Sequence, residues 1–467
     1  MRISFHGAAR RVTGSKHIIH TDEGKKILLD CGMFQGEGTE TAPLNSHFGF
    51  NPAEIDVMVL SHAHIDHSGL VPRLVKEGFR GKIWCTPATF ELTKILLEDS
   101  AKIQEADYGY INKKRLRQKK SMIDLLYTIE DVKKCFDYFE ILPYDQPQTI
   151  LTGVDLLFTD AGHIIGSAVV NLTVQSGDTS RNITFTGDVG SFQNQILKNP
   201  EKFPQADVII CESTYGNRLH EKAESSATEL LNWITHTCLH KKGKLIIPAF
   251  SVGRTQEILY QLNSLELDGK LPHLAFYVDS PLSTKATEIL KKFKGGYNDE
   301  VKNVLEHDED PFSFRGLNYI ESVDESKALN YKEEPCVIIS ASGMADAGRV
   351  KHHIANNIEN PANTILMSGY CESSSLGARL QNKPEEVRIF GDIFKLRAEV
   401  AALKSMSAHG DYLDIFEFLK CQDISKVKHL YLVHGEFEGQ IEFRERLHKI
   451  GFFDIQIPDM HSIYDID

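Results

Sequence analysis

Side chains that can bind metal ions are concentrated in one ten-residue stretch, SHAHIDHSGL at positions 61–70. His62, His64, Asp66 and His67 fall within six consecutive positions there. Imidazole and carboxylate groups are ligands suited to Zn²⁺. One short loop would crowd four ligands around a single ion, but it can aim His62 and His64 at one metal and the other two at a neighbouring metal. The pattern H-x-H-x-D-H therefore predicts part of a two-metal site.

The remaining ligands must come from distant segments. His163, Asp188 and His434 each end an apolar strand-like run and are followed by small residues. A carboxylate can bridge two ions, so we expect Asp188 to be the bridge, with His163 completing the first metal and His434 the second. Two metals about 3.5–4 Å apart can hold a hydroxide and clamp a phosphate or carbonyl oxygen.

Short apolar runs that end in polar, glycine-bearing loops must position these ligands. The runs GKKILLDCGMFQG (24–36) and IDVMVLSHAHIDHSGL (55–70) both have this form, and SGLVPRLVKEG (68–78) predicts a helix. More strands are expected in VDLLFTDAGH (154–163) and ADVIICES (206–213). The pattern predicts sheet-rich layers that are flanked by helices.

The segment from Glu91 to Tyr138 is different, because it is long, charged and helical in pattern. It contains NKKRLRQKK (112–120), the only dense basic run of the chain. This run predicts either a solvated helix face or an arm near the active site that contacts phosphate groups.

Repeated strand–loop–helix units predict a second domain between about 213 and 400. Examples are GKLIIPAFSVGRTQEILYQL (243–262) and PCVIISASGMADAGRVKHHI (335–354). Such units form parallel α/β sheets, which bind ligands at the loops after the strands. The first kind of pattern returns after Lys404, so the second domain is expected to be inserted into the first.

Composition narrows the class of protein. The 467 residues predict two domains, and no apolar run approaches the 20 residues of a membrane-spanning helix. The eight cysteines are scattered singly, which favours reduced thiols over a disulfide framework. The start of the chain lacks the features of a signal peptide, so a cytoplasmic protein is expected. The net charge of −13 argues against a nucleic-acid partner unless bound cations reverse the local field.

These residues carry a family resemblance. The metal cluster, His163, Asp188 and LLDCGMFQG (28–36) resemble the metallo-β-lactamase superfamily. The motifs CESTYG, PAFSVGRTQEIL, SASGM, SGYCESSSLGARL, SAHGD and LVHGE resemble its β-CASP branch, which includes the cleavage and polyadenylation endonuclease and its bacterial and archaeal relatives. The resemblance implies an α/β fold, namely a metallo-β-lactamase αββα sandwich (1–212 and 401–467) with an inserted Rossmann-like β-CASP domain (213–400).

The resemblance also implies a metal set of two Zn²⁺ ions. It assigns His62, His64 and His163 to the first ion, and Asp66, His67 and His434 to the second, with Asp188 as the bridge. Asp30, in LLDCG, matches the first motif of the family and is expected to orient the ligands.

Catalytic roles follow from the same resemblance. His409 matches the presumed general acid, and Glu212 matches the acidic residue that orients it; a structural polar pair is the alternative. His434 points to RNA, because DNA-processing members carry a small apolar residue there. Arg254, Ser342, Gly343 and Arg379 are the candidate substrate-binding residues, since arginine forks and loop N–H groups suit phosphate. The stretch 371–378 departs from the family pattern, although Gly377 and Arg379 are kept.

The sequence therefore predicts a zinc-dependent ribonuclease that hydrolyses phosphodiester bonds of single-stranded RNA. A hydroxide that bridges the metals would attack phosphorus, oriented by Asp66 and Asp188, and His409 would protonate the leaving 3′ oxygen. Three alternatives stay open, namely a small-molecule hydrolase, a DNA nuclease and a scaffold without catalysis. Endonuclease and 5′-exonuclease action are not distinguished, and neither is the oligomeric state, for which a homodimer is one option.

Overall fold

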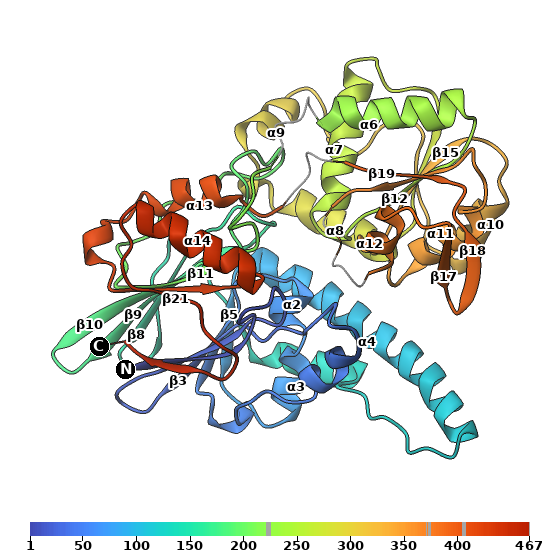
Figure 1. Ribbon diagram of the computed structural model, residues 1–467. Helices are drawn as coiled ribbons and strands as arrows, with labels where there is room; N and C mark the ends of the chain where they lie inside the picture. The colour runs from blue at the N-terminus through green and yellow to red at the C-terminus, as the bar shows by residue number, and fades with distance from the viewer. Residues whose placement is uncertain (221–225, 370, 372–374, 404–407, 467) are drawn as a thin grey trace. The chain divides into compact units, whose positions relative to one another are not determined.

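The computed structural model describes residues 1–220, 226–369, 371, 375–403 and 408–466, and its chain divides into two compact units (Figure 1). The first unit consists of residues 1–194, 199–219 and 409–467, and the second of 195–198 and 220–408. The main crossings between the units therefore lie a few residues beyond the limits of 212 and 400 that were expected from the sequence.

Two seven-stranded sheets form the centre of the first unit. The first sheet contains, in spatial order, β22 (Ile463–Asp465), β1 (Arg2–Gly7), β2 (Lys16–His20), β3 (Lys26–Leu29), β4 (Val57–Val59), β5 (Lys82–Cys85) and β6 (Phe139–Ile141). The second contains β21 (Ile455–Gln456), β20 (His429–Val433), β11 (Val208–Glu212), β10 (Thr179–Phe185), β9 (Ala168–Ser176), β8 (Val154–Asp160) and β7 (Gln148–Leu151). Each sheet has a parallel and an antiparallel half.

The alternation of side chains along each strand divides the apolar residues between two layers. In β3, Ile27 and Leu29 join the core between the sheets, whereas Leu28 faces the opposite way into an outer cluster. In β11, Val208 and Ile210 point into the same central core. These strands are apolar on both faces because both faces are covered.

Helices cover the outer faces of both sheets. The outer cluster of the first sheet is closed by α3 (Val71–Lys76), α4 (Pro87–Arg117) and α5 (Ile129–Cys135), and that of the second by α13 (Tyr412–Leu419) and α14 (Phe437–Lys449). Figure 1 shows α13 and α14 on the side of the sandwich opposite α3 and α4. The first unit is thus an αββα sandwich, as predicted.

The second unit has a six-stranded parallel sheet, in the order β14 (Leu317–Tyr319), β13 (Ala275–Val278), β15 (Cys336–Ser340), β12 (Leu245–Pro248), β16 (Thr364–Met367) and β19 (Glu399–Ala402). Its helices are α6 (Ser226–Ile234), α7 (Arg254–Leu267), α8 (Pro281–Lys292), α9 (Asp299–Val304), α10 (Val323–Tyr331), α11 (Arg349–Asn357) and α12 (Leu376–Gln381). A small hairpin consists of β17 (Glu386–Ile389) and β18 (Asp392–Lys395). The alternation of strands and helices confirms the predicted α/β class.

The charged segment 91–138 contains a long helix that ends at Arg117 and a short helix that begins at Ile129. The first half of α4 packs on the sandwich, with Leu92, Leu97 and Ala101 fully buried. Among the residues described, no helix is both long enough and apolar enough to cross a membrane.

Candidate metal centre

The H-x-H-x-D-H stretch lies directly after a buried parallel strand. β4 ends at Val59, and the single-turn helix α2 (Ile65–Ser68) begins after His64. His62 and His67 are 0% and 1% exposed. The tight turn separates the ligands into two pairs, because His62 and His64 precede the helix whereas Asp66 and His67 belong to it.

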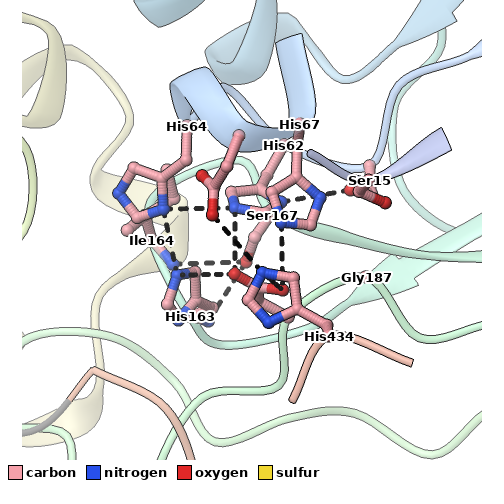
Figure 2. Close-up of polar contacts among 12 residues, drawn as sticks. Ser15, His62, His64, His67, His163, Ile164, Ser167, Gly187 and His434 are labelled. Carbon is pink, nitrogen blue, oxygen red and sulfur yellow. Dashed lines mark hydrogen bonds and ion pairs between the residues drawn. The ribbon is translucent and has the colours of Figure 1, made fainter. Parts of the chain in front are cut away.

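His62, His64, His163 and Asp188 form the first cluster. The Nε2 atoms of His62 and His163 each lie 3.2 Å from His64 Nδ1. Asp188 Oδ2 lies 3.4 Å from His62 Nε2 and 3.5 Å from His163 Nε2. Ligand atoms about 2.1 Å from a tetrahedral zinc ion are about 3.4 Å apart, so the cluster has the dimensions of such a site. Figure 2 shows these nitrogen atoms pointing toward one another.

Asp66, His67 and His434 form the second cluster, which the other carboxylate oxygen of Asp188 completes. Asp188 Oδ1 lies 3.2 Å from His67 Nε2 and 3.5 Å from His434 Nε2. His434 Nε2 is also 3.4 Å from Asp66 Oδ2. Asp188 therefore presents one oxygen to each cluster, which is the arrangement of a carboxylate that bridges two cations.

Two buried atoms of the second cluster show what the donor set requires. Within the described part of the chain, neither His67 Nε2 nor Asp188 Oδ1 makes a hydrogen bond of normal geometry, although the two atoms lie 3.2 Å apart. Buried polar atoms are costly to leave unsatisfied. A divalent cation bound between these atoms would satisfy both, so the residues present fit a metal ion.

Asp30 orients the second cluster from behind. Its Oδ2 accepts a hydrogen bond from His67 Nδ1 at 2.6 Å, which directs His67 Nε2 toward the cluster. The backbone N–H and the hydroxyl of Ser61 donate to the same carboxylate at 2.8 and 2.9 Å, and the Ser15 hydroxyl donates at 3.3 Å. A carboxylate behind a histidine fixes the tautomer that binds metal.

His434 follows β20 and adopts a left-handed backbone conformation with φ +52°. Its Nδ1 lies 2.9 Å from the hydroxyl of Thr214, and its backbone N–H donates to Ala8 O at 2.7 Å. Sequence reasoning did not single out Thr214, although the residue follows Glu212 closely in CESTYG. Thr214 therefore orients the His434 ring, as Asp30 orients the His67 ring.

Glu212 and His409 form a pair beside the first cluster. His409 Nδ1 lies 3.1 and 3.2 Å from the two carboxylate oxygens of Glu212. Backbone N–H groups of Val189 and Thr214 also donate to this buried carboxylate. The opposite nitrogen, His409 Nε2, lies 3.9 Å from Asp188 Oδ2 and therefore faces the clusters.

Burial lowers the pKa values of some histidines of the site, whereas nearby carboxylates raise that of His409. Burial lowers the pKa of His62 to about 3 and that of His64 to about 4. Neutral imidazoles of this kind have a lone pair free for a cation. Burial also opposes the charged form of His409, but the carboxylates of Glu212 and Asp188 outweigh it and raise the pKa of His409 to about 9.

Three protein-family models match successive parts of the chain. They are the metallo-β-lactamase superfamily over residues 17–234, the β-CASP domain over 255–380, and the Zn-dependent metallo-hydrolase RNA specificity domain over 394–458. A protein named Ribonuclease TTHA0252, from Thermus thermophilus, is 35% identical over 94% of this chain and 94% of its own. The chain belongs to the β-CASP family of the metallo-β-lactamase superfamily.

Two other relatives match nearly the whole of this chain. The RNase J-like protein of Methanocaldococcus jannaschii is 30% identical over 94% of both chains. The cleavage and polyadenylation specificity factor 73 of Drosophila melanogaster is 29% identical over 93% of this chain and 60% of its own. This β-CASP protein is therefore a metal-dependent hydrolase. Its fold implies that it binds divalent metal ions, and the His/Asp clusters agree with this.

The candidate substrate-binding residues of this β-CASP protein lie in loops and helices at one edge of the parallel sheet. Ser342 and Gly343 follow β15, and Gly343 adjoins the ring of Phe250 in the loop after β12. Arg254 begins α7, but its guanidinium is buried and paired with Glu257. Arg379 is exposed on α12. Of the two arginines, only Arg379 presents an accessible fork, and residues 372–374 of the neighbouring divergent stretch lie outside the described residues.

Proposed function

We propose that this β-CASP protein is a zinc-dependent ribonuclease that hydrolyses phosphodiester bonds of single-stranded RNA. The observation that carries the proposal is the position of Asp188, which has one oxygen in each of two ligand clusters while His409 Nε2 lies 3.9 Å away. The names of the relatives, which include a ribonuclease and an RNase J-like protein, support RNA as the substrate.

Two zinc ions are proposed because of the donor types and their spacing. Three imidazoles and one carboxylate would hold the first ion, and two imidazoles and two carboxylates the second. Ligand sets that contain two or more imidazole nitrogens favour zinc over Mg²⁺ and Ca²⁺, which prefer oxygen ligands. When bound, the two ions would supply a nucleophile from water at neutral pH and neutralise charge on the phosphate oxygens.

The chain's own residues would provide orientation and a proton. The buried carboxylate of Asp188 and the partly buried carboxylate of Asp66 can orient the attacking water. Glu212 holds His409 Nδ1, so that the proton on Nε2 is available to the leaving 3′ oxygen. Protonation of that oxygen yields a 3′-hydroxyl and a 5′-phosphate. A proton donor of this kind contributes on the order of 10²–10⁴-fold to the rate.

The test is to quantify zinc in the purified protein and incubate it with 5′-labelled single-stranded RNA and the matching DNA. We expect RNA cleavage that chelation abolishes and that His409→Ala slows by about 10²-fold or more with zinc retained. His307→Ala is the matched control, because His307 is exposed and distant in sequence from the cluster motifs.

The products separate the remaining alternatives. Mononucleotides at early times indicate 5′-exonuclease action, and internal fragments indicate endonuclease action. Cleavage of DNA instead of RNA makes the protein a DNA nuclease. Two bound zinc ions without cleavage of either polymer would contradict the proposal and favour a small-molecule hydrolase or a scaffold.

A further inference from the structure

The second half of α4 leaves the body of the first unit. After Ala101, no side chain described in this helix is buried, whereas Leu92, Leu97 and Ala101 are fully buried in its first half. Figure 1 shows the C-terminal end of α4 projecting beyond the helices that cover the sheet. The helix has 31 residues and is therefore about 46 Å long, at 1.5 Å per residue.

The projecting end of α4 leads into a turn that several hydrogen bonds stabilise. Asn112 binds the backbone of Ile123 in both directions, with its side-chain amide donating to Ile123 O at 2.9 Å and its oxygen accepting from Ile123 N at 2.8 Å. Arg115 Nε donates to Ser121 O, and Lys120 N donates to Arg115 O. Lys119, with φ +56°, reverses the chain. These bonds hold the basic run of the sequence in a defined shape.

Five cations lie in the last part of α4 and in the turn that follows it, and we call them the cationic tip: Lys113, Arg115, Arg117, Lys119 and Lys120. All but Arg115 are exposed. None of the five forms an ion pair with a described residue, whereas many other lysines and arginines of the chain do. Like charges at close range repel one another, so a cluster without counter-ions indicates an anionic ligand.

Helix stability does not account for the whole cluster. Cations in the last turn of a helix interact favourably with its carbonyl ends, which explains Arg115 and Arg117. Lys119 and Lys120 lie beyond the last helical residue. The rest of the chain is acidic, with a net charge of −13 for the whole sequence. A cationic surface on an acidic protein attracts a polyanion locally while the body repels it.

We propose that the cationic tip is a second RNA-binding site, which holds the phosphate backbone of long substrates without regard to sequence. The inference rests on the proposed function, because RNA is the polyanion that the metal centre would act upon. Leu116 and Met122 are 58% and 61% exposed among the cations, and they offer apolar surface to unstacked bases. An acidic protein partner is the competing occupant.

The position of α4 relative to the metal centre sets the length of RNA that reaches both sites. The hydroxyls of Thr86 and Thr89, at the start of α4, both donate to Gly166 O, three residues beyond His163. The tip begins about 40 Å further along the helix. A stacked strand advances about 3.4 Å per nucleotide, so about 12 nucleotides span this distance. A 30-mer can therefore contact both sites, whereas a 6-mer cannot.

The test compares two triple variants with the same change in net charge. K113E/R117E/K119E reverses three tip cations and keeps Arg115, which supports the turn. K426E/K428E/K449E reverses three exposed lysines in a different part of the first unit. Zinc content and melting temperature are measured first, to establish that both variants fold and hold metal like the wild type.

Binding is measured with a phosphorothioate RNA 30-mer, whose backbone charge is kept but whose linkages resist hydrolysis. Each phosphate contact contributes about 0.7 to the slope of log Kd against log salt for single strands. We expect the tip variant to bind the RNA at least about tenfold more weakly at low salt. Its slope of log Kd against log salt should be smaller than that of the wild type by about 2. The control variant should keep the slope of the wild type.

Cleavage separates the tip from the metal centre. With a 6-mer, kcat/KM should be the same in the wild type and the tip variant, whereas with a 30-mer the KM of the tip variant should rise. If no RNA is cleaved by any protein but the slope still falls in the tip variant, the proposed function fails and the second site stands. Equal losses of affinity in both variants, or an unchanged slope, would overturn the second site. In the case of an unchanged slope, the acidic protein partner becomes the better occupant.

Discussion

At the scale of a single residue, the carboxylate of Asp188 connects the two ligand clusters. Its two oxygens lie in different clusters, 3.4 Å from His62 Nε2 on one side and 3.2 Å from His67 Nε2 on the other. The nearby histidines hold the pKa of this buried carboxyl well below its usual range, against the effect of burial itself. The Asp188 carboxylate is therefore already negatively charged when a cation binds.

The first prediction concerns Asp188→Asn. The amide has one oxygen and no charge, so it cannot serve both clusters. We expect the zinc content to fall from two to one ion or fewer per chain, measured by metal analysis after gel filtration. The control is Asp207→Asn, since the Asp207 side chain accepts a backbone hydrogen bond from Asn182 and belongs to neither cluster. Retention of two zinc ions by Asp188→Asn would contradict the bridging role.

Lys16 is a buried charge that the sequence did not draw attention to. It is 0% exposed, and its Nζ donates to Gly14 O at 2.8 Å and to Gly32 O at 2.7 Å. The ammonium also lies 4.2 Å from the centre of the Phe34 ring. Burial lowers the pKa of Lys16 from 10.5 to about 7. The residue therefore ties the segment after Asp30 to the segment before β2.

The second prediction is a pH dependence of stability that Lys16→Met removes. Between pH 7 and 10.5 the unfolded chain binds a proton that the folded protein has lost, so the free energy of unfolding rises with pH in this window. In this window, the free energy of unfolding of the wild type should rise relative to that of the variant by up to about 1.4 kcal/mol per pH unit. Urea unfolding with excess chelator measures both proteins, and parallel pH curves would show the prediction to be wrong.

At the scale of elements, the site depends on close contact between the loop after β3 and the helix α2. Cys31 N, in this loop, donates to His67 O at 2.8 Å, and Ser15 N, just before β2, donates to Asp66 O at 2.8 Å. A Cβ atom on Gly32 would lie 1.6 Å from Asp66 O. Only glycine lets these two segments approach so closely, and this approach places Asp66 and His67.

The third prediction is that Gly32→Ala displaces the second cluster. The clash is with backbone, so it should cost about 1–3 kcal/mol of stability and weaken zinc binding about tenfold or more. Gly109→Ala is the contrast, because nothing lies within 4 Å of its Cβ position in α4 and alanine favours a helix by up to about 1 kcal/mol. Calorimetry and zinc titration measure both effects, and equal outcomes would refute the role of the close contact.

At the scale of the whole molecule, the metal centre joins both sheets of the sandwich. His62 follows β4 of the first sheet, whereas His163, Asp188 and His434 follow strands of the second. The clusters therefore link segments from the beginning, the middle and the end of the chain. A bound cation stabilises only the folded arrangement, because the unfolded chain does not bring these ligands together.

The fourth prediction is that removal of metal destabilises the fold. Zinc at 100 times its Kd contributes about 2.7 kcal/mol per site, so chelation should lower the melting temperature by several degrees and added zinc should restore it. The melting temperature of Asp188→Asn should respond much less to the chelator. A wild-type melting temperature that does not change on chelation would speak against a metal centre that links the sheets.

Much of the site could be predicted because its signals are local. The H-x-H-x-D-H pattern and the strand-end positions of His163, Asp188 and His434 are visible in short windows, and the resemblance supplied Glu212 and His409. The structure places all of them within one group of contacts. Thr214 and Lys16 were missed, because their partners His434 and Gly32 lie elsewhere in the sequence. The helical segment 91–138 was predicted, but its turn at Lys119 was not.

By itself, the amino-acid sequence determined the types of ligand and the alternation of apolar residues, because both depend on neighbouring positions. Only the tertiary structure decided which oxygen of Asp188 faces which cluster and which nitrogen of each histidine points inward. It also decided that Arg254 is buried against Glu257, whereas four of the five cations of the tip are exposed. These outcomes depend on contacts between segments that are far apart in the chain, and such contacts leave no periodic or local signal.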